Sequence, residues 1–172
     1  MENNYKILQK TIAEKISFSG IGLHSGKICN VKLLPAAPDS GITFIRKDLQ
    51  TNNIIPADYK HIYKSNLCTT LKANNSDAKV LTVEHLLAAI RGNEIDNVKI
   101  EIDSQEIPIL DGSSREYDTI IKKAGTCEQK NSYKKFLIIK DKISIKSKNS
   151  FFLIEPCGYL QINCTVDFPS PI

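Results

Sequence analysis

The chain has 172 residues, of which 41% are hydrophobic and 24% are charged, and its formal net charge is +4. This composition is typical of a soluble globular protein with one or two domains and a buried core. The 23 basic residues are scattered along the chain, so we expect no nucleic-acid binding. No apolar stretch approaches the length of a membrane span, so we do not expect an integral membrane protein.

The cysteines and the start of the chain indicate a cytoplasmic protein. Five cysteines with no Cys-x-x-Cys spacing are typical of a reducing compartment, and they argue against a disulfide framework or a cysteine zinc site. The first residues contain no apolar core, so no signal peptide is apparent.

The N-terminal part of the chain predicts a hairpin with a long tip. Residues 10–18 alternate loosely and predict one strand, and residues 29–34 alternate clearly and predict a second. Three glycines in residues 20–26 indicate a loop with special backbone angles. The loop lacks the Lys-Ser/Thr ending of a phosphate-binding P-loop, and His24 within it is interpreted as a surface turn residue.

The middle of the chain is less regular. Residues 35–41 predict a turn, and residues 42–46 predict a strand that ends in charged residues. Residues 49–65 are ambiguous, and His61 within them is interpreted as a solvated loop residue. Residues 66–71 predict a short strand with Leu67, Thr69 and Leu71 on one face.

A helix over residues 82–91 follows. Thr82 is expected to cap its N-terminus, and Gly92 suits a left-handed position just past its end. The residues expected to face the core are Val83, Leu86, Leu87 and Ile90. Glu84 and His85 interrupt this apolar pattern in the first turn. From local pattern alone they would be an ordinary exposed helix start, yet a carboxylate beside an imidazole is the arrangement here that most resembles chemistry.

The remaining elements complete one α+β domain over residues 1–126. Residues 98–103 predict a strand, and residues 104–112 predict a loop. Ser113 and Glu116 fit a capping box that opens a second helix, which Gly125 closes. The buried stripe of this helix is expected to be Tyr117, Ile120, Ile121 and Ala124. Strands and two amphipathic helices predict two layers.

The last segment predicts the start of a second domain. Residues 127–133 are polar and are interpreted as a linker. The strands expected in residues 134–172 are 136–140, 142–146, 150–155 and 159–168. Strands without a helix leave an apolar face and an edge uncovered, so we interpret this segment as an incomplete, strand-rich unit.

Five stretches, read together, resemble the UDP-3-O-acyl-N-acetylglucosamine deacetylases, the zinc-dependent enzymes of lipid A synthesis. They are Gly20–Gly26, Leu67–Thr69, Thr82–Leu86, Gly92–Asn97 and Glu106–Ser113. They occur in the family's order and at roughly its spacings, and the last stretch is the most distinctive. The resemblance implies a two-layer sheet-and-helix sandwich of the ribosomal S5 domain 2-like type, facing a second such domain with zinc between them.

The resemblance also implies roles for four residues. In that family the Glu-His pair at a helix start supplies the general base and the first zinc ligand, which would be Glu84 and His85. Zinc activates a bound water in hydrolases, and a neighbouring carboxylate can accept the proton of that water. Leu67 and Cys68 resemble residues that line the substrate passage. The implied substrate is UDP-3-O-acyl-N-acetylglucosamine, and the implied reaction is hydrolysis of its N-acetyl group, the committed step of lipid A (lipopolysaccharide) synthesis.

The sequence departs from the family's pattern after His85. The family completes its zinc site with a His and an Asp on a later helix and has a further catalytic His, but no histidine follows His85 here. A catalytic zinc needs about three protein ligands, so we expect an incomplete zinc site and little activity from this chain alone. We do not expect His24 or Asp103 to substitute as ligands.

Two alternatives stay open. One is a split enzyme, in which a second chain carries the missing ligands and docks against residues 134–172. The other is a non-catalytic binding domain that retains the fold, including an RNA-binding domain, which would show salt-sensitive RNA binding.

Overall fold

The computed structural model describes residues 6–64, 67–148 and 150–167. The chain divides into two compact units, Met1–Lys134 and Lys135–Ile172. Within the described residues, no helix combines the length and the apolar character needed to cross a membrane.

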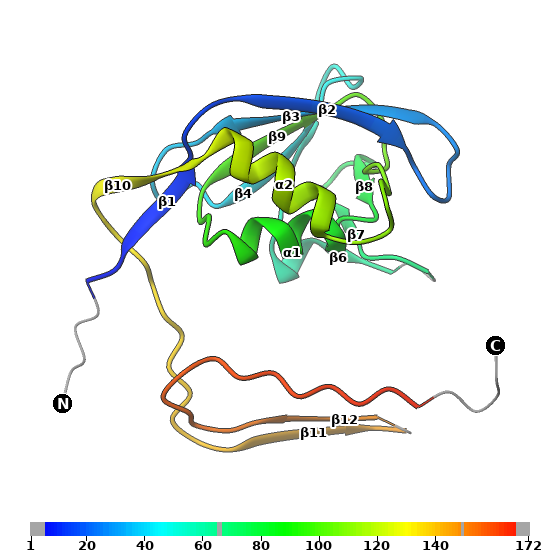
Figure 1. Cartoon of the computed structure of the whole chain (residues 1–172). Coiled ribbons are helices and arrows are strands. Elements are labelled where there is room, and N and C mark those ends of the chain that lie inside the picture. The colour runs from blue at the N-terminus through cyan, green and yellow to red at the C-terminus, as the bar shows by residue number, and fades with distance from the viewer. Residues whose placement is uncertain (1–5, 65–66, 149, 168–172) are drawn as a thin grey trace. The chain divides into compact units, whose positions relative to one another are not determined.

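A five-stranded sheet forms one layer of the first unit (Figure 1). Its strands, in spatial order, are β2 (Ile16–Ile21), β3 (Ile28–Pro35), β9 (Val98–Ile102), β4 (Ile42–Arg46) and β5 (Ile54–Pro56). Neighbouring strands run antiparallel except β4 and β9, which are parallel. The predicted alternation of β3 is confirmed, because Cys29, Val31 and Leu33 are buried while Asn30 and Lys32 are exposed.

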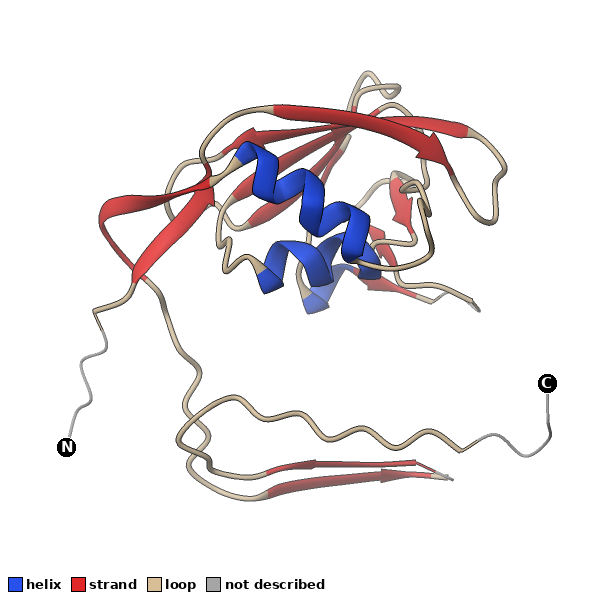
Figure 2. Ribbon diagram, viewed as in Figure 1, coloured by secondary structure: helices blue, strands red, loops and turns tan. Residues whose placement is uncertain are grey.

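Two helices form the second layer (Figure 2). They are α1 (Glu84–Gly92) and α2 (Arg115–Ala124), and both bury apolar residues in the core that they share with the sheet. Leu86 and Ile90 of α1 and Tyr117 and Ile121 of α2 are fully or almost fully buried. An α+β fold with two helices, predicted from the sequence, is therefore confirmed.

The strand predicted over residues 10–18 is wrong as a single element, because it consists of two strands that belong to different sheets. β1 (Leu8–Ile12) pairs antiparallel with β10 (Thr126–Tyr133), whereas β2 lies in the main sheet. The chain turns between them where the amides of Ala13 and Glu14 donate to the carbonyls of Gly125 and Ala124. Residues 127–133, for which the sequence suggests a linker, are thus part of a paired strand.

Buried polar groups hold this two-stranded ribbon against the domain. The Asn97 side-chain amide donates to Oε1 of Gln9 and to Oε1 of Gln129, both at 2.7 Å, and its Oδ1 accepts from the amide of Gly41 at 2.8 Å. Buried amides of this kind are stabilising only when their partners are present. The polar residues 127–133, which suggested a linker, therefore include a member of this hydrogen-bond network, Gln129.

A small second sheet of the first unit contains β6 (Ile62–Tyr63), β7 (Thr70–Lys72) and β8 (Lys79–Leu81). The strand expected over residues 66–71 begins only at Thr70, and Asn66 lies outside the described residues. The sequence pattern does not indicate β8. His61 is not a solvated loop residue, because it lies in a 3₁₀ turn, η1 (Tyr59–His61), and its Nδ1 is 2.7 Å from Oδ1 of Asp58 with the imidazole 10% exposed.

The second unit contains one antiparallel hairpin, formed by β11 (Ile143–Ser147) and β12 (Ser150–Ile154). Two of the predicted strands are therefore confirmed with shifted bounds. Residues 136–140 and 159–167 form no strand in the described part of the chain, and Phe168 with residues 169–172 lies outside it. Alternation alone does not make a strand, because its backbone N–H and C=O groups need a neighbouring strand to pair with.

Candidate active site at the start of helix α1

Helix α1 begins at Glu84, and the residues before it are arranged differently from the expectation. Val83 is the N-cap and has helical backbone angles without a side-chain capping bond. Thr82 does not cap the helix, because its φ is +58° and its hydroxyl donates to Oε1 of Glu106 at 2.9 Å. The end also differs: Gly92 is the last helical residue, and the left-handed residue is Glu94, with φ +57°.

Glu84 is half-buried, and its position is set by a contact with the segment before β7. Its Oε2 accepts a hydrogen bond from the amide of Thr69 at 3.0 Å, and the Thr69 carbonyl accepts from the amide of Val83 at 3.4 Å. These two bonds tie the first turn of α1 to Thr69. His85 follows in the same turn and is also half-buried, directly before the buried Leu86 in the sequence.

The other two residues singled out from the sequence lie immediately before Thr69. The side chain of Leu67 is exposed, at 81% of its full area, and Cys68 is half-buried with its Sγ 3.6 Å from Oγ1 of Thr70. The structure therefore brings residues 67–69 to the same place as the start of α1.

Glu106 is a buried carboxylate that sequence reasoning missed. It has no exposed surface, and its oxygens accept hydrogen bonds from the amide of His24 at 2.9 Å, the amide of Ser25 at 2.7 Å and the hydroxyl of Thr82 at 2.9 Å. The sequence feature that could have drawn attention to Glu106 is its position as a lone carboxylate directly before the apolar run Ile107–Leu110. A charged residue in such a place is either solvated or fully paired, and here it is fully paired.

The surroundings of Glu106 keep it ionised. Burial acts to raise its pKa, but the hydrogen bonds from Ser25, His24 and Thr82 outweigh burial, and they hold the pKa of Glu106 below its ordinary value. A carboxylate that accepts several N–H and O–H donors is stabilised in its charged form. Glu106 is therefore an acceptor around which the neighbouring segments are arranged.

The glycine-rich loop is shaped to approach this carboxylate. A Cβ atom at Gly22 would lie 2.5 Å from Oε2 of Glu106 and 2.5 Å from Oγ of Ser25, so a side chain there would displace one of these two groups. Gly26, with φ +64°, lets the loop close back so that its amide donates to the carbonyl of Gly22 at 3.0 Å. The glycines thus allow the loop to approach a carboxylate of the protein itself. This agrees with the sequence, in which the loop lacks the ending of a phosphate-binding P-loop.

The stretch around residues 105–110 connects the loop, the helix start and α2. The amide of Leu81 donates to the carbonyl of Gln105, and the amide of Ile107 donates back to the carbonyl of Leu81. The amide of Ile109 donates to the carbonyl of Ile21, and the hydroxyl of Tyr117 donates to the carbonyl of Pro108.

The capping box predicted for α2 is wrong in its register. Arg115 is the first helical residue and Ser114 is the N-cap, so Glu116 lies too early to close a box with Ser113. The Ser113 hydroxyl instead accepts from the amide of Arg115 at 3.1 Å. The buried stripe of α2 is confirmed for Tyr117, Ile121 and Ala124, and Gly125 closes the helix at φ +68°.

A complete zinc site does not fit the donor set available here. In the described residues, no three or more His, Cys, Asp or Glu side chains gather where they could hold a metal ion. His24 is exposed, and Asp103 accepts hydrogen bonds from the amide and side chain of Asn30. His85 supplies one imidazole, whereas catalytic zinc takes about three protein ligands.

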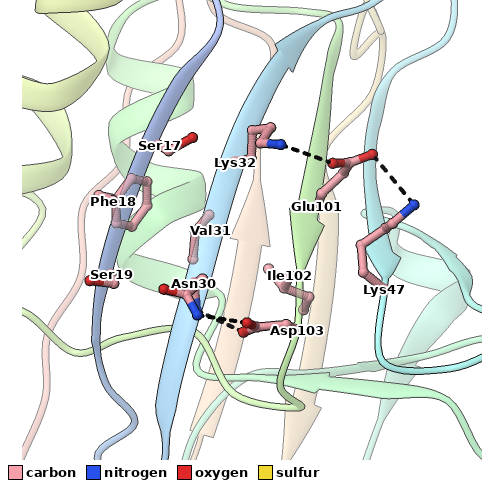
Figure 3. Close-up of a pocket in the computed structure, with 10 residues that line it drawn as sticks. All are labelled: Ser17, Phe18, Ser19, Asn30, Val31, Lys32, Lys47, Glu101, Ile102 and Asp103. Carbon is pink, nitrogen blue, oxygen red and sulfur yellow. Dashed lines mark hydrogen bonds and ion pairs between the residues drawn. The ribbon is translucent and has the colours of Figure 1, made fainter.

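A shallow pocket on the outer face of the main sheet lies away from these residues (Figure 3). Its charged groups pair with one another: Glu101 lies 4.0 Å from Nζ of Lys32 and 3.9 Å from Nζ of Lys47. Asn30 and Asp103 form a second pair at its edge. We therefore place the candidate site at Glu84 and His85 and not in this pocket.

Comparison with known proteins gives one family. Residues 9–172 match the family described as UDP-3-O-acyl N-acetylglycosamine deacetylase. A protein of Myxococcus xanthus named UDP-3-O-acyl-N-acetylglucosamine deacetylase is 38% identical over 164 residues, which are 95% of this chain and 51% of that protein. A protein of the same name from Haemophilus influenzae (strain PittEE) is 37% identical over 165 residues, 96% of this chain and 53% of that protein.

This chain therefore spans about half the length of the curated relatives that it matches. The match nevertheless extends over nearly all of its residues, including the five stretches noted in the sequence. The chain belongs to the UDP-3-O-acyl N-acetylglycosamine deacetylase family.

Proposed function

We propose that this chain supplies the Glu84–His85 part of an enzyme that hydrolyses the N-acetyl group of UDP-3-O-acyl-N-acetylglucosamine, in the cytoplasmic synthesis of lipid A. The observation that carries the proposal is the family match over residues 9–172, combined with a Glu-His pair in the first turn of α1 whose carboxylate is held by the Thr69 amide. We also propose that the first unit is a sandwich of the ribosomal S5 domain 2-like type, which the family resemblance implies.

In this proposal Glu84 is the general base. It accepts the proton of the water that attacks the acetamide carbonyl, and it then helps to protonate the leaving amine. The bond from Thr69 fixes one oxygen of the carboxylate, so the direction of the side chain is set before substrate binds. Leu67 and Cys68, on the preceding residues, would line the passage for the acyl chain of the substrate.

His85 would be the first ligand of the family's zinc ion. Because the described residues do not complete a zinc site, we assign no step to the metal here. The remaining ligands would come from a polypeptide segment that these 172 residues do not include, either continuous with this chain or on a second chain that docks against residues 134–172. Exposed apolar side chains of the β11–β12 hairpin, among them Ile145, Phe151 and Phe152, favour such a docking surface.

The experiment is a complementation assay for deacetylation. The chain is assayed with zinc and UDP-3-O-acyl-N-acetylglucosamine, alone and together with a polypeptide covering the half of the Haemophilus influenzae relative that this chain does not match. We expect activity only in the combination. Glu84→Gln should lower kcat by about 10²- to 10⁴-fold, the usual size for loss of a general base. His85→Ala should lower zinc retention.

Glu116→Gln is the matched control, because Glu116 is an exposed carboxylate on α2, and it should leave activity unchanged. An inactive combination, or a Glu84→Gln variant with full activity, would contradict the proposal. Tightly bound zinc and full activity in the chain alone would instead show that the described residues suffice.

A further inference from the structure

Three segments far apart in the sequence meet at the carboxylate of Glu106. Its Oε1 accepts from both the His24 amide and the Thr82 hydroxyl, and its Oε2 accepts from the Ser25 amide. The same carboxylate thus holds the glycine-rich loop and the residue that precedes the first turn of α1. Both belong to stretches that resemble the family, but the proposed reaction uses neither contact.

Thr82 needs this partner because its backbone is unusual. A β-branched residue with φ of +58° is a genuine outlier, since its side chain crowds the backbone in the left-handed region. The conformation is fixed from two sides: Leu81 is bonded through both its amide and its carbonyl to the segment around Glu106, and the Thr82 hydroxyl is bonded to Glu106 itself. Strain of this kind persists only where the surroundings hold it.

The conformation of Thr82 determines where Glu84 and His85 point. Val83 alone separates Thr82 from the first helical residue, and its amide donates to the carbonyl of Thr69. The amide of Thr69 in turn donates to Glu84. A change of backbone angle at Thr82 would therefore rotate the first turn of α1 and break the contact between Thr69 and Glu84.

We propose that Glu106 is a positioning residue, which holds Thr82 in its left-handed conformation and so orients Glu84 and His85. It acts through Thr82 and does not itself touch substrate. Its effect on catalysis rests on the proposed function, whereas the link from Glu106 to the Thr69–Glu84 contact is a property of the fold and can be measured without activity.

Amide hydrogen exchange tests the link. In Glu106→Gln we expect the Thr69 amide to lose protection by about tenfold, the size expected for losing one hydrogen bond to a charged group. Amides of β3 and β9 in the main sheet should keep their protection. Glu106→Asp, which keeps the charge on a shorter side chain, should restore part of the protection at Thr69, and Glu116→Gln should change nothing. Unchanged protection of Thr69 in a folded Glu106→Gln variant would overturn the proposal.

A second pair of variants examines the same link from Thr82. Thr82→Val keeps the shape of the side chain but removes the hydroxyl, and it should reduce protection of Thr69 as Glu106→Gln does. Thr82→Ser keeps the hydroxyl and should not. The double variant Glu106→Gln/Thr82→Val should be no worse than either single variant, because both remove one interaction. If Glu106→Gln does not fold, the Val and Ser variants decide: equal protection of Thr69 in the two would overturn the proposal.

The complementation assay then separates this proposal from the proposed function. We expect Glu106→Gln to lower kcat by about ten- to a hundredfold with little change in KM, since small displacements of a catalytic group are costly. If the wild-type combination is inactive, the proposed function fails while the exchange result still decides the link. If the wild type is active and Glu106→Gln keeps its full kcat, the positioning role fails while the function stands.

Discussion

Two glutamates near the start of α1 differ in what surrounds them. Glu84 is half-buried and accepts one bond from the backbone, a setting that is consistent with the role of general base proposed for it. Glu106 is fully buried and saturated with donors, a setting that keeps it charged. The sequence indicated Glu84 through its histidine neighbour, but it could not indicate Glu106, whose role depends on which donors the fold brings to it.

The lowered pKa of Glu106 predicts how stability responds to acid. In the unfolded chain the carboxyl titrates near its ordinary value of 4.5, and in the folded chain it titrates lower. Its contribution to the free energy of unfolding is therefore complete above that value and is lost as pH falls through the folded pKa. We expect wild type to exceed Glu106→Gln by about 2 kcal/mol at neutral pH.

Urea unfolding of both proteins between about pH 7 and pH 3 measures this difference. The difference should shrink below the ordinary glutamate pKa. Since the other carboxylates are common to both proteins, their titration cancels in the comparison. A difference that stays constant over the whole range would show that the Glu106 carboxylate does not favour its charged form.

At the scale of the elements, both ends of α1 differ from their expected chemistry. A threonine followed by an apolar period predicts an N-cap, but the tertiary bond to Glu106 takes the hydroxyl instead. A glycine after the last apolar residue predicts a left-handed cap, but here the helix continues through Gly92 and Glu94 takes the positive φ.

A glycine at the end of a helix is usually interpreted as a left-handed cap that other residues replace poorly, but for Gly92 we predict that alanine is stabilising. Its φ is not in the left-handed region, and a Cβ there would meet nothing within 4 Å. Gly92→Ala should raise the free energy of unfolding by about 0.5–1 kcal/mol, because alanine loses less entropy in a helix. Thermal and urea unfolding measure it. Gly26→Ala, at φ +64°, is the contrasting control and should destabilise. Destabilisation by Gly92→Ala would contradict this prediction, because it would mean that residue 92 needs backbone angles outside the helical region.

Local pattern predicted the elements whose pairing is short-ranged or whose burial is regular. The strand β9, the buried stripe of α2 and the pairing of β2 with β3 belong to this group, although β2 begins at Ile16 and extends to Ile21, into the predicted loop. It failed for β1 and β10, because residues such as Gln9 and Gln129 look solvated until Asn97 is placed between them. At the site, the sequence singled out Glu84 and His85, whose roles belong to the proposed function. It could not indicate the bonds of Thr69 to Glu84 and of His24 to Glu106, because these join residues 15 and 82 positions apart.

At the scale of the whole molecule, the two units differ in how much they bury. The first has a continuous core that joins the main sheet, both helices and the small sheet. In the second, the hairpin side chains are mostly exposed, and an isolated two-stranded hairpin is marginally stable in water. We therefore expect the cooperative unfolding transition of the chain to arise from the first unit.

A fragment ending at Lys134 should unfold cooperatively, with a free energy of unfolding within about 1 kcal/mol of that of the whole chain. Lys134 is a sound end point, because its Nζ lies 3.0 Å from Oδ2 of Asp96 and donates to the carbonyl of Glu94. A fragment ending at Gly125 lacks β10 and Gln129, and it should be clearly less stable. Circular dichroism melts compare the three, and a large loss in the fragment ending at Lys134 would show that the second unit stabilises the first.

The burial of Cys29 on the inner face of β3 has a consequence for chemical labelling. Burial, with a smaller effect from the nearby Asp103, raises the pKa of this thiol to about 11, so it is protonated and enclosed at neutral pH. Cys127, Cys157 and Cys164 are exposed. Because thiolates are the reactive form, alkylating reagents modify the exposed cysteines of the native protein first. Cys29 becomes reactive only when the main sheet opens, so the chain carries its own reporter of unfolding in the domain that holds Glu84 and His85.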